Sequence, residues 1–426
     1  MKKLICLFAA FVLIFSVLPV VPASGAAISG FSPSHKLTAG QFRDVDPGTW
    51  YYRYVETAYN YGIFSGKAPD VFDPSGNITL GEAIKIVSVI NSLYINNSAP
   101  FNEGTPFYRV YADYAKEQGI IDGDLRYTSP ATRAEIAELL YKALPESEYP
   151  VLRDIPDGSI FDVFSDDPNS LAIYSLYRAG IFSGSDDYGT FNKNTHITRA
   201  EICAAVSRII LPSLRSDVWS PLTLPPAELY ARCVDAVFTI STYGKDGELI
   251  RDGSGFFISE SGLAATNAHV LDNAESAVIT LHDGRELDVL GVNAYNAEYD
   301  LAVFTVKGSG FSRLALGDSD KILIGSVLYA IGSPLSLSGS ISDGVVSHTV
   351  REYAGTLYFQ FTAPISFGSG GGPVIDKNGR VIGVACSSFN YAQNLNLAVP
   401  VNLIKQLKIG ETRRMSLFTA VDTGIL

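Results

Sequence analysis

The stretch Phe367-Gly368-Ser369-Gly370-Gly371-Gly372-Pro373-Val374 has the composition of a glycine-rich turn that enters a β-strand. Elsewhere in this half of the chain, short apolar or alternating runs, such as residues 237–240 and 381–384, are separated by clusters of Gly, Asn, Asp and Ser. Many short strands with turn signals between them are typical of a barrel or a sandwich. The sequence therefore predicts an all-β domain of about 200 residues, which we place at residues 227–410.

Two further stretches precede this turn in a fixed order. Thr266-Asn267-Ala268-His269-Val270 places a histidine between small residues just after a strand, and Asp300-Leu301-Ala302-Val303 places an acid at a strand start. A nucleophilic hydroxyl needs a base that takes its proton and an acid that fixes the tautomer of that base. His269 and Asp300 are therefore candidates for base and acid, although Asp300 alone could equally cap a turn.

Residues 228–408 resemble the trypsin-like domain of the HtrA (Deg) serine proteases. The resemblance implies a double β-barrel in which His269 is the general base and Asp300 orients it. It also implies an oxyanion hole made by the backbone amides of Gly368 and Gly370. Besides the stretches above, the matched segments are Gly253-Ser254-Gly255-Phe256, Gly317-Asp318-Ser319-Asp320, Ala330-Ile331-Gly332-Ser333-Pro334, Gly344-Val345-Val346-Ser347, Asp376 through Gly383, and Ala398-Val399-Pro400.

The nucleophile position departs from the family pattern. Family members commonly have Ala-Pro-Ile-Ser-Pro-Gly-Ser-Ser-Gly-Gly-Pro, whereas this chain has Ala-Pro-Ile-Ser-Phe-Gly-Ser-Gly-Gly-Gly-Pro at residues 363–373. The two align without a gap, so Gly370 falls at the nucleophile position and Ser369 precedes it. Adjacent side chains in an extended or tightly turned segment point in different directions, which turns Ser369 away from His269.

Three interpretations of this domain follow. The favoured one is a protease-derived module that binds extended peptides without turnover, because loss of the nucleophile costs on the order of a million-fold in turnover. The alternative is an active extracellular serine endopeptidase that uses Ser369, His269 and Asp300 after a one-residue shift of the turn. The third is a scaffold with no ligand, against which the retention of His269 and Asp300 counts. Residues near the turn predict a small or apolar side chain in the ligand.

One pattern occurs three times before this domain, and we place the repeats at residues 40–95, 100–146 and 158–211. Each repeat has an aromatic helix that ends in Gly-Ile and a Thr-x-x-Glu that opens a second, amphipathic helix with a capping box. Such a short helix pair cannot bury its own apolar face, so the three pairs are expected to pack together in an all-α module. The Thr-x-x-Glu steps are Thr79-Leu80-Gly81-Glu82, Thr132-Arg133-Ala134-Glu135 and Thr198-Arg199-Ala200-Glu201.

These repeats resemble the S-layer homology (SLH) repeat, through segments such as Phe42-Arg43-Asp44-Val45 and Ile197-Thr198-Arg199-Ala200-Glu201. The resemblance implies a noncovalent anchor on the cell wall that binds an anionic polysaccharide. Arg133 and Arg199 would stand at helix N-termini, where amides and a guanidinium together can bind an anion. Asp44 and Trp50 are the other polymer-binding candidates. Repeat 1 has Leu80 where the arginine belongs. The less favoured alternative is that both arginines are solvated helix starts.

Residues 1–26 combine two lysines, an apolar run and a small-residue segment, which together are typical of a secretory signal peptide. An uncleaved membrane anchor is the competing interpretation. We expect an exported protein at the cell wall, with no membrane contact after cleavage. Residues 212–226, rich in proline, are expected to be a semi-rigid linker, and residues 411–426 a C-terminal tail. No peptide-binding PDZ domain is expected after the barrels.

The composition limits the partners. The chain has 426 residues and a net charge of −12, so its field would repel nucleic acid, and its ordinary hydrophobic content disfavours disorder and coiled coils. Cys203, Cys233 and Cys386 are too widely spaced for a disulfide framework or a zinc site. No metal or organic cofactor is implied. The expected partners are an anionic cell-wall polysaccharide and a polypeptide substrate or peptide ligand.

Overall fold

The computed structural model describes residues 27–333, 339–353, 355–388 and 395–418. The expected signal peptide therefore lies outside the described residues, as does the end of the expected tail. The chain forms two compact units. The helical unit contains residues 27–153, 175–182 and 194–218, and the barrel unit contains residues 154–174, 183–193 and the chain from residue 219 onward.

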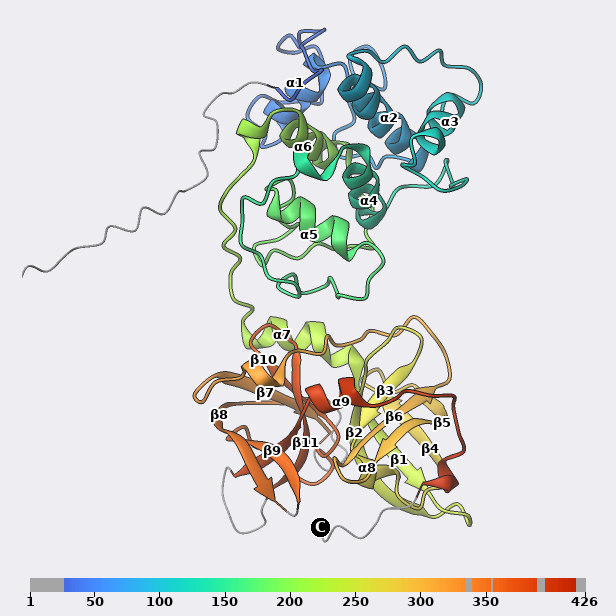
Figure 1. The fold of residues 1–426 in the computed structure, drawn as a ribbon, viewed down its shortest axis with the longest axis vertical. Helices are drawn as coiled ribbons and strands as arrows, with labels where there is room; N and C mark the ends of the chain where they lie inside the picture. Colours follow the sequence, from blue (N-terminus) through green and yellow to red (C-terminus); the bar gives the residue numbers. More distant parts are fainter. Residues whose placement is uncertain (1–26, 334–338, 354, 389–394, 419–426) are drawn as a thin grey trace, which may run out of the picture. The chain divides into compact units, whose positions relative to one another are not determined.

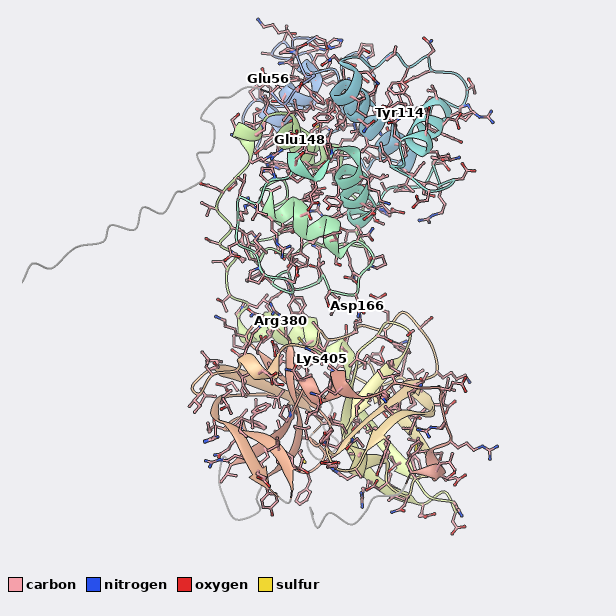
Figure 2. The ribbon with its side chains drawn as sticks, viewed as in Figure 1. Glu56, Tyr114, Glu148, Asp166, Arg380 and Lys405 are labelled. Carbon is pink, nitrogen blue, oxygen red and sulfur yellow. The ribbon has the colours of Figure 1, made fainter. Side chains whose placement is uncertain are left out.

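Three pairs of helices alternate with loops in the first half of the chain (Figure 1). Within the helical unit, α2 packs against α3 and α4, and α1 packs against α6. Hydrogen bonds between side chains join the helical segments as well: Tyr114 donates to Asn91 Oδ1 at 2.7 Å, and Tyr94 donates to Glu148 Oε1 at 3.0 Å. Tyr114 and Glu148 are labelled in Figure 2. The pairs are α1 (Tyr52–Asn60) with α2 (Leu80–Asn96), α3 (Arg109–Glu117) with α4 (Arg133–Ala143), and α5 (Ser170–Arg178) with α6 (Arg199–Ile210).

The second helix of each pair begins at a complete capping box. Thr79, Thr132 and Thr198 each accept a hydrogen bond from the backbone amide three residues later, and the glutamate at that position accepts from the amide of the threonine. Each box satisfies two amides that the first helical turn leaves without partners. The three predicted helix starts are confirmed.

The loops before these three helices meet in a ring of backbone hydrogen bonds. Ala131 N donates to Ile78 O at 2.9 Å, Ile78 N donates to Ile197 O at 3.4 Å, and Ile197 N donates to Ala131 O at 3.3 Å. All three side chains are buried. Corresponding residues of the three repeats therefore surround one pseudo-threefold axis, which explains why one repeat alone could not bury its apolar face.

The barrel unit contains two closed six-strand barrels, which Figure 1 shows side by side. The spatial order is β1-β2-β3-β6-β5-β4 in the first barrel and β10-β11-β12-β9-β8-β7 in the second, with antiparallel neighbours. Closure leaves no free sheet edge. The strands are β1 (Val237–Tyr243), β2 (Leu249–Phe257), β3 (Leu263–Thr266), β4 (Ser276–Leu281), β5 (Glu286–Asn296), β6 (Leu301–Val306), β7 (Val327–Gly332), β8 (Ser340–Tyr353), β9 (Thr356–Phe361), β10 (Pro373–Asp376), β11 (Val381–Ser388) and β12 (Asn396–Pro400).

Aromatic side chains fill both barrels. Phe238, Phe257 and Phe304 are buried together in the first, and Phe359 and Phe361 are buried in the second. A third apolar cluster between the barrels includes side chains from the short helices α7 (Pro226–Cys233) and α9 (Asn402–Gln406). Burying such residues is the main favourable term in folding. The predicted fold class, an all-α module followed by an all-β double barrel, is confirmed.

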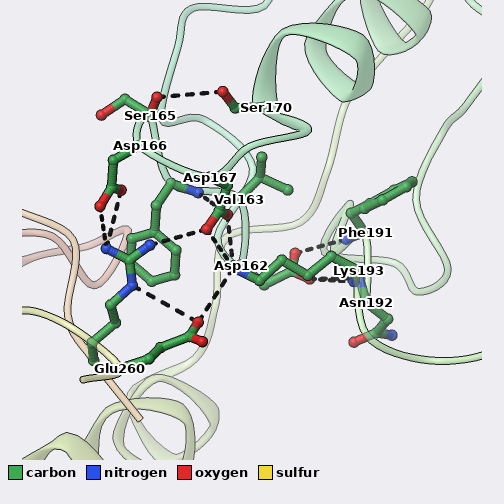
Figure 3. A network of polar contacts seen from close by, with 12 residues as sticks. Asp162, Val163, Ser165, Asp166, Asp167, Ser170, Phe191, Asn192, Lys193 and Glu260 are labelled. Atoms are coloured by element: carbon green, nitrogen blue, oxygen red, sulfur yellow. Dashed lines mark hydrogen bonds and ion pairs between the residues drawn. The ribbon is translucent and has the colours of Figure 1, made fainter. Parts of the chain in front are cut away.

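The barrel unit also includes two segments of the expected third repeat. Arg313, which follows the first barrel, donates to both oxygens of Asp166 at 2.7 and 3.0 Å and to Asp167 at 3.0 Å (Figure 3). Its guanidinium lies 4.0 Å from the centroid of the Phe164 ring. The arginine side chain is only 9% exposed, so these contacts replace most of its hydration.

A second arginine, Arg232, also binds segments of the expected third repeat. Arg232 of α7 pairs with Asp186 at 3.1 Å and with Glu228 at 2.8 Å, and its guanidinium lies over the rings of Phe161 and Tyr188. The expected third repeat at residues 158–211 therefore contributes chain to both compact units. The helical periodicity of the sequence gives no sign of this division. The division depends on contacts with Arg232 and Arg313, which follow the repeat in the chain.

Candidate active site

His269 and Asp300 come together because β3 and β6 are paired. The register joins Thr266 to Ala302, so the helix α8 (Ala268–Leu271) that follows β3 lies beside the residue that precedes β6. His269 Nδ1 lies 2.8 Å from Asp300 Oδ2 and 3.0 Å from Oδ1. A carboxylate only accepts hydrogen bonds, so Nδ1 carries the proton and Nε2 of the neutral ring is an acceptor.

Asp300 is held in place by three other groups. Its carboxylate accepts from His269 N at 2.9 Å and from Cys386 Sγ at 3.2 Å, and its carbonyl accepts from Asn267 Nδ2 at 3.0 Å. Burial, together with the Asp300 charge, raises the pKa of the Cys386 thiol well above its usual range. The thiol therefore stays protonated and remains a donor. No local sequence pattern indicates this role for Cys386 or Asn267.

Ser254 of the first barrel fixes the glycine-rich turn of the second. Its amide donates to Gly370 O at 2.8 Å, and its hydroxyl donates to Gly368 O at 2.7 Å while accepting from Ser333 N at 3.0 Å. A Cβ at Gly371 would collide with Ser254 O, and the positive φ of Gly371, +86°, also disfavours a side chain there. Residues of both barrels therefore fix the conformation of this turn.

The two amides predicted for an oxyanion hole lie in this turn. Within the described part of the chain, neither Gly368 N nor Gly370 N donates a hydrogen bond to the protein. Gly368 has φ +89°, a conformation that favours glycine. Gly372 N donates to Ser369 O at 3.1 Å, which fixes the peptide plane that carries Gly370 N, and Ser254 holds the adjoining carbonyls of Gly368 and Gly370. Both N–H groups stay available to a ligand oxygen.

Position 370 faces the histidine. A Cβ built on Gly370 would lie 3.8 Å from His269 Nε2, 3.7 Å from Asn267 Oδ1 and 3.3 Å from Cys386 O. These are contacts that a side chain tolerates with at most a small shift of the Cys386 carbonyl. The gapless alignment and this geometry therefore agree on residue 370 as the position that faces the base.

Ser369 lies elsewhere. Its hydroxyl accepts a hydrogen bond from Ser366 N at 3.3 Å, and among the described residues none joins it to His269. Ser369 is buried and lines a cavity of about 250 Å³. The other residues that line this cavity carry no charge, and they include Ile331, Ile341 and Ala385.

A larger cavity, about 1140 Å³, lies elsewhere in the barrel unit. Asp166, Arg380 and Lys405 are among its lining residues and are labelled in Figure 2. Neither His269 nor Asp300 lines it. The candidate site is placed at the glycine-rich turn, because residue 370 of the turn faces His269. The smaller cavity adjoins this turn through Ser369.

The two arginines predicted to bind polymer are engaged within the helical unit. Arg133 donates to Glu201 at 2.8 Å, and Arg199 donates to the carbonyls of Phe72 at 2.9 Å and Ser65 at 2.7 Å. Both side chains are buried, at 5% and 6% exposure. Each arginine at a helix start thus reaches a different repeat of the chain.

The departure at Leu80 has a counterpart in the second repeat. Arg133 lies over Phe182 and Arg199 lies over Phe64, and each of these rings follows a Gly-Ile step. The corresponding residue of the second repeat is Ile121. The interface that lacks the arginine therefore also lacks the aromatic ring on which the arginine would stack.

Asp44 and Trp50 differ from each other. Asp44 accepts from Phe72 N at 2.9 Å and Asp73 N at 2.6 Å, so both of its oxygens brace a loop. Trp50 is 60% exposed and packs at an angle against Tyr51. Of the four polymer-binding candidates, Trp50 is the one whose side chain stands well out in solvent.

No helix among the described residues has the length and apolar character that crossing a membrane requires. In the same ranges, no group of three or more His, Cys, Asp or Glu side chains is placed to hold a metal ion.

Comparisons with known proteins agree with this arrangement. The profile of the S-layer homology domain matches residues 41–84, and that of the trypsin-like peptidase domain matches residues 253–384. A probable periplasmic serine endoprotease DegP-like from Halomonas elongata is 36% identical over 157 residues, which are 35% of this chain and 33% of that protein. The mitochondrial serine protease HTRA2 from Drosophila ananassae is 32% identical over 217 residues, 46% of this chain and 50% of that protein.

Among solved structures, the HtrA-type protease AlgW with tripeptide is 29% identical and has a TM-score of 0.40, covering 43% of this chain and 62% of that one. The chain spans a third to a half of the length of the curated relatives described above. Two closed barrels with His269 and Asp300 between them define the class, a trypsin-like peptidase domain. The chain carries an S-layer homology domain followed by this peptidase domain, whose homologues are the HtrA and DegP serine proteases, and both predicted resemblances are confirmed.

Proposed function

We propose that the protein is a cell-wall-bound module that binds extended peptides in a serine-protease fold and forms no acyl-enzyme. The observation that carries the proposal is the geometry at residue 370. A side chain there would face His269 Nε2, yet the residue is glycine, while the hydroxyl of Ser369 accepts from Ser366 N instead. A base without an adjacent hydroxyl cannot start covalent catalysis.

Peptide binding is supported by what surrounds this position. The amides of Gly368 and Gly370 can receive a carbonyl oxygen, and the 250 Å³ cavity beside them is lined without charge. A small or apolar side chain of the ligand fits such a cavity better than lysine or arginine, because a charge would lose its hydration there without gaining a partner. We therefore propose that the ligands are peptides that place a small apolar side chain in this cavity.

The proposed anchor is the SLH region, which would bind an anionic polysaccharide of the cell wall. Trp50 supports a role in sugar contact, because it is the exposed candidate and sugar rings pack on aromatic faces. Arg133 and Arg199 are proposed to shape the grooves between repeats, since they are engaged with other repeats. Sedimentation with purified cell walls tests the anchor. Trp50→Ala is expected to reduce the bound fraction, whereas Leu249→Ala, an exposed apolar position of the barrel unit, is expected to leave it unchanged.

The second candidate is an active endopeptidase that uses Ser369. The observation in its favour is the intact pair of His269 and Asp300, at 2.8 Å. A shift of the turn by one residue would bring the Ser369 hydroxyl to the base, but it would also break the hydrogen bonds from Ser254 that hold the turn.

A fluorophosphonate probe distinguishes the two candidates. The full chain is treated with the probe, any adduct is mapped by mass spectrometry, and His269→Ala serves as the control. If the proposed function is correct, no adduct forms on the folded protein. An adduct on Ser369 that disappears in the His269→Ala variant would establish the endopeptidase instead.

A further inference from the structure

We propose that the site hydrolyses acyl esters directly with water, which His269 and Asn267 hold beside Gly370. This inference goes beyond peptide binding and rests on the proposed function in one respect, that no serine is acylated. It concerns the chemistry that a histidine, an acid and two free amides can still perform when residue 370 has no side chain.

The first observation is a pair of hydrogen-bond acceptors that face residue 370. His269 Nε2 is one of them, because Nδ1 carries the ring proton and donates a hydrogen bond to Asp300. Asn267 Oδ1 is the other. Asn267 is fully buried, and its Nδ2 donates to the carbonyl of Asp300, which can only accept, so Oδ1 must be the atom turned toward residue 370.

The second observation is that Asn267 Oδ1 is a buried oxygen with no protein partner among the described residues. A buried polar atom without a partner costs about 1–3 kcal/mol, so such atoms are usually satisfied by solvent or ligand. Two acceptors that converge on one position call for a group with two donors. Water has two donors, and it also has the lone pairs that a nucleophile needs.

The third observation is the position of the amides. Gly370 supplies both the open space in front of His269 and one of the two N–H groups expected to bind an acyl oxygen. An ester whose carbonyl oxygen accepts from Gly368 N and Gly370 N would present its carbon to the same side of the turn. In the homologous arrangement of serine proteases that carbon is the point of attack.

The reaction balances without any other reactant. His269 Nε2 takes one proton from water as the water oxygen bonds to the acyl carbon, and the carbonyl oxygen becomes an oxyanion bound by the two amides. The intermediate then collapses: the ester C–O bond breaks, and the proton on Nε2 passes to the departing alkoxide. The products are a carboxylic acid, which ionises in water, and an alcohol. No bond to the protein forms at any stage.

Esters are the expected substrates because their leaving groups need little help. Without an acyl-enzyme, a serine-protease site keeps about 10³–10⁴-fold acceleration over water through binding and its oxyanion hole. A positioned general base typically adds 10²–10⁴-fold. Peptide amides, whose uncatalysed hydrolysis is far slower, would remain bound and essentially uncleaved.

Steady-state hydrolysis of N-acetyl-L-alanine p-nitrophenyl ester by the full chain tests the proposal. We expect linear release of nitrophenol with no initial burst and no acyl adduct after acid quench. His269→Ala is expected to lower the rate about 100-fold, to the level that the amides alone provide. The matched control is His35→Ala, an exposed histidine of the helical unit, which is expected to leave the rate unchanged.

The second variant is Gly370→Ala, which still tests the proposal if His269→Ala folds poorly. Its Cβ would make only ordinary or slightly tight contacts, so the fold is expected to persist. The methyl group occupies space in front of His269, and we expect at least a 10-fold loss of ester hydrolysis.

Two results would overturn the inference, and they differ in what else they affect. Equal rates for the wild type and both variants would remove the water mechanism and leave peptide binding untouched. A burst with an acyl group on Ser369 would overturn the water mechanism and the proposed function together.

Discussion

Ser254 N donates to Gly370 O at 2.8 Å, so a strand of the first barrel holds the turn of the second at the residue that faces His269. The Ser254 hydroxyl adds a bond to Gly368 O and accepts one from Ser333 N. The candidate site is thus a junction of both barrels, and a buried serine holds the turn that carries its two amides.

Ser254→Ala tests this dependence. The change leaves the Gly368 carbonyl and the Ser333 amide without their partner, and each unsatisfied buried group costs about 1–3 kcal/mol. We expect the free energy of unfolding, measured by urea denaturation, to fall by about 2 kcal/mol. Ser309→Ala, at an exposed site, is expected to stay within about 0.5 kcal/mol. Equal stability of the two variants would show that the hydroxyl does not hold the turn.

Arg313→Ala tests the attachment of residues 154–174 to the barrels. Removing one partner of a buried ion pair costs about 3–5 kcal/mol, and the exposure of Asp166 lowers our expectation to about 2 kcal/mol. The control is Arg285→Ala, which removes an arginine paired with Asp283 on the surface and is expected to cost less than about 1 kcal/mol. Thermal unfolding of the full chain measures both. A smaller effect for Arg313→Ala than for Arg285→Ala would contradict the assignment of this segment to the barrel unit.

Asp318 predicts a pH dependence of stability. Hydrogen bonds from Asn402 and Lys321 lower the pKa of Asp318 from 3.8 to about 2. A carboxyl whose pKa is lower in the folded state stabilises the protein above its unfolded value, and that contribution disappears as the pH falls toward the folded value. Asp318→Asn is therefore expected to be less stable than the wild type above about pH 4, and the difference is expected to disappear as the pH falls through about 2. A difference that stays constant across this range would contradict the expectation.

The cysteines predict a chemical result. Burial raises the pKa of Cys233 to about 12 and that of Cys386 well above its usual range, and Cys203 is fully buried. The thiolate is the reactive form, so we expect iodoacetamide at pH 8 to modify none of the three until urea unfolds the chain. Modification of Cys386 in the folded protein, detected by mass spectrometry, would show that its contact with Asp300 is open to solvent.

Local patterns in the sequence predicted much of this structure. The Thr-x-x-Glu steps are capping boxes because their hydrogen bonds span only three residues, and the short strands form barrels because their turns are encoded between them. The pairing of His269 with Asp300 was predictable because each residue lies in a short motif, and the two motifs occur in a fixed order that can be recognised in a single sequence.

Contacts between distant residues were not predictable in the same way. Cys386 lies 86 residues after Asp300, and Arg313 lies 147 residues after Asp166, so no local pattern links the members of either pair. Asn267 belongs to the motif that contains His269. Its role nevertheless depends on which atom of its side-chain amide faces Asp300, and only the packed site determines that. Long-range pairing likewise explains why the third repeat contributes to both units.

The most direct test of the central claim, that residue 370 occupies the nucleophile position, is the Gly370→Ser variant of the full chain. Its rate of peptide cleavage is compared with that of the wild type, and fluorophosphonate adducts are mapped by mass spectrometry. We predict an adduct at residue 370 that requires His269, and cleavage at least 100-fold faster than in the wild type, given that a missing nucleophile costs on the order of a million-fold. A folded variant with no adduct at that residue and an unchanged or lower rate would contradict the claim.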